Sequence, residues 1–94
     1  MRLAYGAIHE VTDEKLLFAK QLGATDIVVH TPPLPGEGYW EFIRLLMLRT
    51  RIEAAGLRLA AIENIPHTWY LKAMLGQPGR EEQIQNFCTT LRNM

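Results

Sequence analysis

The sequence predicts an α/β fold, namely part of a (β/α)8 TIM barrel built from three successive β-α units. Three short, continuously apolar segments alternate with longer segments of helical periodicity. Continuous apolar character is typical of parallel strands that are covered on both faces. The first connection, His9 to Thr12, lacks the glycine-rich turn that often opens a doubly wound sheet. We therefore favour the barrel over that alternative.

The first predicted unit is a strand over residues 3–8 followed by a helix. The strand is the apolar run Leu3-Ala4-Tyr5-Gly6-Ala7-Ile8. Thr12 is a good N-cap, and two acidic residues follow it in the first turn, where the helix dipole favours anions. Gly23 is a natural residue to end this helix.

The second unit begins with the β-branched run Ile27-Val28-Val29, flanked by Asp26 and His30. Residues 31–38 contain three prolines and therefore cannot form a helix. A helix follows them and ends at Gly56. Its apolar face is predicted at Phe42, Leu45, Leu48, Ile52 and Ala55.

The third unit is a strand from Arg58 to Asn64 and a helix that begins near Arg80. Residues 65–79 contain two prolines, two glycines and the aromatic pair Trp69-Tyr70, and we expect a shaped loop with no regular helix. Connections of this length are usually functional or disordered. The apolar stripe of the last helix is predicted at Ile84, Phe87, Cys88 and Leu91.

Composition limits the classes of function. The chain has 94 residues, enough for one small domain, and 48% of them are hydrophobic, which is typical of a globular protein. Ten Lys and Arg balance ten Asp and Glu, and this balance argues against nucleic acid as a partner. No apolar run suits a membrane span or a signal peptide. With one cysteine and no internal disulfide possible, we expect a cytoplasmic protein.

Three units are fewer than the eight that close a barrel, which typically takes about 250 residues. The last predicted helix has no glycine stop, and no fourth strand follows it. We therefore expect residues 1–94 to be the truncated amino-terminal portion of a larger enzyme. The open sheet edges should associate with further chain or with other copies, so we expect a homo-oligomer or edge-to-edge association.

Polar residues that close the predicted strands are the candidates for a substrate site. The carboxyl ends of parallel strands carry the active sites of β-α enzymes. His30 closes the second strand and either contacts substrate or bonds nearby backbone. Glu63 follows four apolar residues, where a carboxylate is costly to bury unless it is paired or hydrated, so we favour substrate contact over a salt bridge. Asn64 either bonds a substrate hydroxyl or caps the loop.

Other notable side chains have simpler interpretations. His9 and His67 lie in predicted loops and are expected to be solvated. Trp69 and Tyr70 form a lid, make a subunit contact or anchor the loop. Cys88 is expected to be a small buried apolar residue.

Several stretches resemble the mannonate dehydratase family of xylose-isomerase-like barrels. They are Tyr5-Gly6, Ile52-Glu53-Ala54-Ala55-Gly56-Leu57, Glu63-Asn64-Ile65-Pro66, and Gln83-Ile84-Gln85-Asn86-Phe87 through Thr90-Leu91-Arg92-Asn93-Met94. The last stretch is the most specific, because its spaced pattern is hard to obtain from generic helix composition. The resemblance covers nearly the whole chain.

The resemblance implies a lyase that removes water from D-mannonate to give 2-dehydro-3-deoxy-D-gluconate with Mn2+ or Fe2+. A base removes the proton at C2, and a general acid helps the C3 hydroxyl to leave. The family's metal-binding His, Cys and Asp belong to later strands, so no metal ligand or catalytic residue is assigned here. His30, Glu63 and Asn64 are assigned to binding of a small sugar acid. A sugar isomerase or epimerase of the same superfamily, and an inert fragment or interaction module, remain alternatives.

Overall fold

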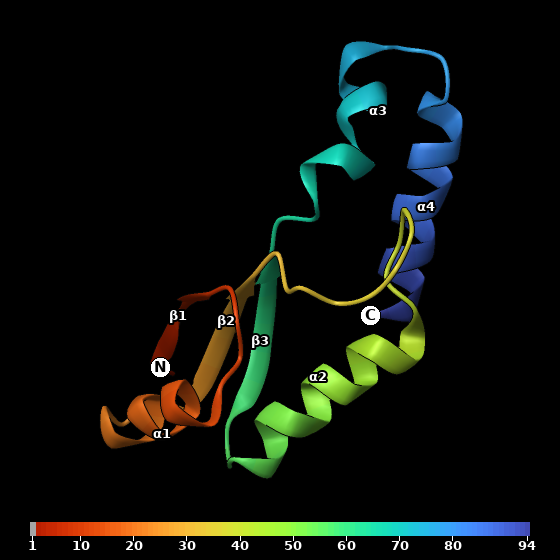
Figure 1. Cartoon of the computed structure of the whole chain (residues 1–94). Helices are drawn as coiled ribbons and strands as arrows, with labels where there is room; N and C mark the ends of the chain where they lie inside the picture. The colour runs from red at the N-terminus through yellow and green to blue at the C-terminus, as the bar shows by residue number, and fades with distance from the viewer. Residues whose placement is uncertain (1) are drawn as a thin grey trace. The chain divides into compact units, whose positions relative to one another are not determined.

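The computed structural model describes residues 2–94 (Figure 1). Contacts divide the chain into two compact units. The first unit contains the chain up to Pro33 together with Met47–Asn64, and the second contains Leu34–Leu46 and Ile65–Met94. The elements are β1 (Ala4–Ile8), α1 (Asp13–Gln21), β2 (Asp26–His30), α2 (Phe42–Ala54), β3 (Arg58–Glu63), the 3-10 turn η1 (His67–Trp69), α3 (Leu71–Leu75) and α4 (Arg80–Asn93).

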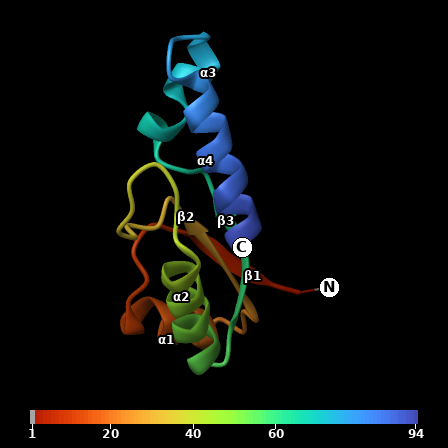
Figure 2. The same ribbon diagram turned by 90° about the vertical axis from the view of Figure 1, so that its right-hand side faces the viewer.

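The first unit contains a three-stranded parallel sheet in the order β1-β2-β3. Ala4 pairs with Asp26, and His30 pairs with Glu63. Helix α1 and the part of α2 that belongs to this unit lie on the same side of the sheet, as the two views in Figures 1 and 2 show. Arg51 of α2 reaches Asp13 of α1 at 3.3 Å. This arrangement confirms the predicted α/β class with parallel strands.

The strands differ in burial. Ile27 and Val29 of β2 are fully buried, whereas most residues of β1 and β3 are exposed or half-buried. Ile27 and Val29 project to one face of β2, and Val28 on the other face is only half-buried. The expectation of strands covered on both faces is therefore wrong for the described chain, in which one face of β2 is buried. The reason is that both helices of this unit lie on one side of the sheet, and that β1 and β3 are its edges in the described part of the chain.

The ends of α1 follow the prediction. The Thr12 hydroxyl accepts a hydrogen bond from the backbone N–H of Lys15 at 3.2 Å, as an N-cap should. Gly23 follows the helix with φ of +83°, a conformation that glycine adopts without steric cost. Helix α2 also ends before a glycine of positive φ, Gly56. On its predicted apolar face, Leu45, Leu48 and Ile52 are buried, but Phe42 is exposed.

The second unit corrects the predicted loop over residues 65–79. This segment contains η1 and the short helix α3, so it is not free of regular structure. The side chain of Gln83 organises it: Oε1 accepts from the backbone N–H groups of Lys72 and Ala73, at 2.9 and 3.2 Å. Nε2 of Gln83 donates to the carbonyl of Thr68 at 2.8 Å. A side chain distant in sequence thus supplies the hydrogen bonds that a single turn of helix lacks at its start.

Helix α4 begins at Arg80 as predicted, but its apolar stripe is not its buried side. Ile84, Phe87 and Leu91 are exposed, while Thr90 is 2% exposed. The buried side is set by hydrogen bonds, because Thr90 and Asn93 both bond the backbone of Trp40. The helices described between residues 2 and 94 include none with the length and apolarity that crossing a membrane requires.

Candidate functional site

Three side chains meet where the strands end in the first unit. His30 is the last residue of β2, and Asn64 directly follows β3. Nδ2 of Asn64 lies 3.2 Å from Nε2 of His30. Nδ1 of His9, which directly follows β1, lies 3.0 Å from the backbone oxygen of His30. We call His9, His30 and Asn64 the strand-end cluster.

The backbone at this edge of the sheet is tightly constrained. Asn64 has a φ of +64°, and Thr31 has a φ of +38°. Such values are uncommon for residues other than glycine, and they gather at functional sites and turns. The N–H of Thr31 donates to the carbonyl of Glu63 at 2.8 Å, which extends the pairing of β2 and β3 past their last residues.

Glu63 is the register partner of His30. Register partners on neighbouring parallel strands project to the same face of a sheet, so the carboxylate and the imidazole share one face. Glu63 is exposed, and no ion pair joins it to any residue between 2 and 94. Solvent thus hydrates this carboxylate in the described chain, and the salt bridge considered as an alternative is not formed there.

The sequence did not place His9 in the site. It was expected to be a solvated loop residue, and it is exposed, but its ring bonds the backbone of His30. The signal that could have found it is its position directly after the first strand, since the carboxyl ends of neighbouring parallel strands lie at one edge. The strand-end cluster and Glu63 together offer an amide, imidazoles and a carboxylate, which suit the hydroxyl and carboxylate oxygens of a small polar ligand.

The described residues do not form a metal site. Between residues 2 and 94, no group of three or more His, Cys, Asp or Glu side chains is arranged to hold a metal ion. The two histidines and the carboxylate at the strand ends are not such a group, so the described residues do not fit a tightly bound divalent cation.

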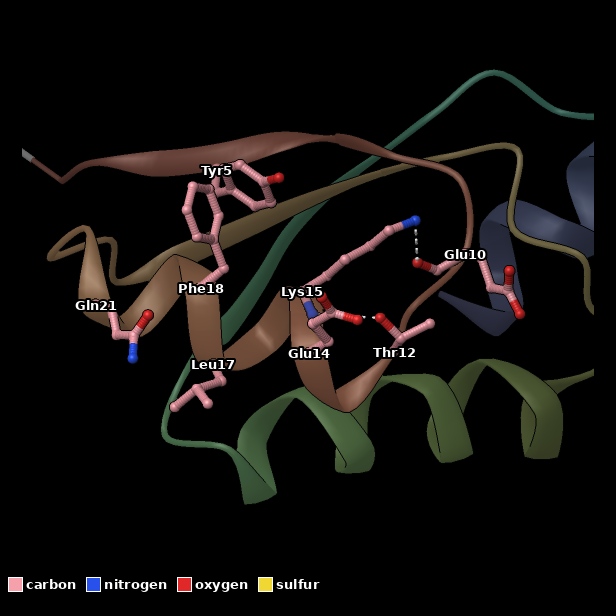
Figure 3. Close-up of a pocket in the computed structure, with 8 residues that line it drawn as sticks. All are labelled: Tyr5, Glu10, Thr12, Glu14, Lys15, Leu17, Phe18 and Gln21. Atoms are coloured by element: carbon pink, nitrogen blue, oxygen red, sulfur yellow. Dashed lines mark hydrogen bonds between the residues drawn. The ribbon is translucent and has the colours of Figure 1, made fainter.

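A pocket of about 550 Å3 lies between β1 and α1, away from the predicted site residues (Figure 3). Tyr5 and Phe18 form an edge-to-face pair in its wall, with ring centroids 5.6 Å apart. Nζ of Lys15 donates to the carbonyl of Glu10 at 3.2 Å, so its ammonium is tied to the backbone. Most of the wall comes from α1 and the segment before it, with Tyr5 alone from β1, and it contains none of His30, Glu63 and Asn64.

The opposite end of the sheet carries an ion pair of a different kind. The carboxylate of Asp26, at the start of β2, is buried and lies 3.3 Å from Nη2 of Arg58. The hydroxyl of Thr25 donates to it at 2.9 Å. Polar groups at the amino ends of barrel strands serve stability rather than catalysis, and we assign Asp26 that role.

The remaining candidates from the sequence lie in the second unit and have structural roles. Trp69 packs edge-to-face on the buried Trp40, with centroids 5.6 Å apart, so it anchors the loop. Tyr70 pairs in the same way with His67, which is exposed as expected. Cys88 is a free cysteine and only half-buried, so the expectation that it is buried is wrong.

Three parallel strands with covering helices and polar side chains at the strand ends define a TIM-barrel-like β-α protein. The chain belongs to the D-mannonate dehydratase (UxuA) family, whose family model matches residues 1–94.

Individual relatives agree with this assignment. Over 90 residues the chain is 33% identical to a mannonate dehydratase from Streptococcus pneumoniae, covering 96% of this chain and 24% of that protein. It is 36% identical over 81 residues to mannonate dehydratase 2 from Halalkalibacterium halodurans, covering 85% of this chain and 23% of that protein. The crystal structure of mannonate dehydratase from Streptococcus suis serotype 2 superposes with a TM-score of 0.76 at 28% identity, over 99% of this chain and 26% of that one. The chain thus spans about a quarter of the length of these relatives.

Proposed function

We propose that residues 1–94 form the amino-terminal part of an enzyme that dehydrates D-mannonate to 2-dehydro-3-deoxy-D-gluconate. The observation that carries this proposal is the family match along the whole chain. The relatives named above are four times as long, and so we assign the activity to a longer polypeptide and not to the 94 residues alone.

The contribution of this chain is binding and orientation of the sugar acid. Its strand-end cluster and Glu63 share the edge of the sheet at which β-α enzymes bind substrate. The hydrated carboxylate of Glu63 accepts hydrogen bonds from sugar hydroxyls. The imidazole of His30 and the amide of Asn64 supply polar contacts beside it. None of them is assigned the proton transfers of the reaction.

Mn2+ or Fe2+ is the cofactor that we expect for the longer enzyme. Because the described residues do not fit a metal site, we place its ligands outside this chain.

A hybrid enzyme tests the proposal. Residues 1–94 replace the corresponding quarter of the Streptococcus pneumoniae relative, and formation of 2-dehydro-3-deoxy-D-gluconate from D-mannonate is measured with Mn2+ present. The control is the same relative without that quarter. We expect activity in the hybrid and none in the control or in the 94-residue chain. A folded, metal-loaded hybrid that leaves D-mannonate unchanged but isomerises an aldose would replace the proposal with the sugar isomerase alternative.

A further inference from the structure

The contact between Asn64 and His30 constrains where the imidazole carries its proton. The amide nitrogen Nδ2 of Asn64 faces Nε2 of His30 at 3.2 Å. An amide nitrogen can only donate a hydrogen bond, so Nε2 must accept with a lone pair. A neutral imidazole that accepts at Nε2 carries its proton on Nδ1. We propose that Asn64 is a positioning residue that holds His30 as the Nδ1–H tautomer.

The backbone of Asn64 makes this contact possible. In an extended strand, residue 64 would project to the face opposite Glu63, because successive side chains alternate. With its φ of +64°, Asn64 leaves the extended conformation directly after β3. Asparagine tolerates this left-handed region better than most residues with a side chain. The sequence thus provides a residue that suits both the backbone and the hydrogen bond.

Two further hydrogen bonds fix the position of His30. Nδ1 of His9 lies 3.0 Å from the backbone oxygen of His30, and a carbonyl can only accept, so the ring of His9 donates. The N–H of Thr31 donates to the carbonyl of Glu63, which locks the end of β2 to the end of β3. The imidazole is therefore held through its ring, its own carbonyl and the next residue.

The tautomer determines what His30 offers to a ligand. The hydrogen bonds described within residues 2–94 engage Nε2 of His30 and give Nδ1 no partner. The Nδ1–H group remains as a donor for an oxygen acceptor, which matches a hydroxyl or carboxylate oxygen of a sugar acid. The hydrated carboxylate of Glu63 on the same face supplies an acceptor. This ligand assignment rests on the proposed function, whereas the tautomer does not.

Nitrogen NMR of the hybrid enzyme labelled with 15N-histidine measures the tautomer directly. The His30 signals are identified by their loss in His30→Gln. We expect the Nε2 shift of a nitrogen without a proton and the Nδ1 shift of a protonated one, at a pH where the ring is neutral. A predominant Nε2–H form in the unmodified hybrid enzyme overturns the proposal, because Asn64 would then present its oxygen to the ring. That result would leave the activity of the hybrid enzyme unaffected, so the two proposals fail separately.

Substitutions of Asn64 provide a second test of the proposed tautomer of His30. Asn64→Asp keeps the size of the side chain and its tolerance of positive φ, but presents only acceptor oxygens, and we expect it to reverse the tautomer to Nε2–H. Asn64→Ala removes the contact and should bring the populations back toward those of free histidine. Gln85→Glu on α4 adds the same charge as Asn64→Asp without touching His30, and it should leave the tautomer unchanged. A tautomer that stays the same in all three variants would show that Asn64 does not position the ring.

Discussion

The backbone N–H of Trp40 donates to the hydroxyl of Thr90 at 3.2 Å, in a buried hydrogen bond that joins residues 50 positions apart. Trp40 is 1% exposed and Thr90 is 2% exposed, so neither group has water as an alternative partner. Asn93 donates to the carbonyl of the same tryptophan at 2.8 Å. Two side chains of α4 therefore satisfy both backbone groups of one buried residue.

Thr90→Val should destabilise the second unit. The substitution keeps the shape of the side chain but leaves the N–H of Trp40 buried without an acceptor, which costs about 1–3 kcal/mol. We expect a lower melting temperature of the hybrid enzyme and faster hydrogen exchange of the Trp40 amide. Thr89→Val is the control, because the Thr89 hydroxyl bonds a carbonyl of its own helix, and its effect should stay within about 0.5 kcal/mol. Equal effects of the two variants would contradict this role of Thr90.

Glu63→Gln tests the candidate site in the hybrid enzyme. The substitution keeps the shape and one acceptor but removes the charge. We expect activity on D-mannonate to fall by roughly tenfold to a thousandfold, the range for a polar contact realised in the transition state. The melting temperature should change little, since Glu63 is exposed and makes no ion pair within residues 2–94.

The matched control is Glu53→Gln on α2, an exposed carboxylate whose partner is Arg49 in the same helix. It should leave turnover unchanged. Normal turnover in Glu63→Gln together with a large loss of melting temperature would show instead that Glu63 belongs to the scaffold.

Two arginine ion pairs of the first unit, Arg58 with Asp26 and Arg49 with Glu53, should differ in their effect on stability. Arg58→Ala removes the nearer of the two arginines beside the buried Asp26 carboxylate, which keeps a hydroxyl hydrogen bond and the more distant Arg2 at 4.0 Å. The loss of this charged contact to a buried group should cost about 1–3 kcal/mol. Arg49→Ala breaks an exposed pair of 2.8 Å, and exposed pairs contribute little. The hydrogen bond to Glu53, and then its charge, raise the pKa of Arg49, but that group already carries its charge at neutral pH. Urea unfolding of both variants in the hybrid enzyme measures the difference, and a larger loss for Arg49→Ala would contradict it.

The 94-residue chain should not bind Mn2+ or Fe2+ tightly. It contains three histidines and one cysteine, and residues 2–94 include no cluster of three ligands. Isothermal titration with Mn2+ measures this, with the hybrid enzyme as the positive control. A single site with a dissociation constant in the low micromolar range or tighter would place metal ligands in this chain.

Alone, the chain should associate with itself. Both β1 and β3 are edge strands, and such edges are templates for pairing with other chains. Apolar side chains of α4 are also exposed, among them Ile84 and Leu91. Analytical ultracentrifugation should show species larger than the monomer, and addition of the remaining three-quarters of a relative should reduce them. A compact monomer with a cooperative melt would contradict this prediction.

The strands and the long helices could be predicted because local signals define them. Thr12 and Gly23 bound α1, and the apolar run before Glu63 defines β3. Local signals failed where a distant side chain decides the structure. Gln83 supplies the hydrogen bonds that allow α3 to form in the predicted loop, and nothing within residues 65–79 encodes that partner.

The candidate site shows the same limit. The positions of His30, Glu63 and Asn64 at the strand ends follow from their place after apolar runs. The contact between His30 and Asn64 depends on a positive φ at Asn64, and the role of His9 depends on how the ends of two strands align. Periodicity carries no information about either. The apolar stripe of α4 was also expected to be its buried side, but the structure leaves it exposed. Periodicity identifies an apolar face of a helix, but it does not identify the element that covers that face.

Each strand of the sheet pairs with the strand that neighbours it in the sequence, β1 with β2 and β2 with β3. Each of these parallel pairings needs only the crossover helix between its two strands, and no strand from elsewhere in the enzyme. During synthesis of a longer family polypeptide, this sheet has all its own strands once β3 has left the ribosome. We therefore expect the first unit to assemble before the rest of the enzyme is translated, and to act as the template on which later strands are added.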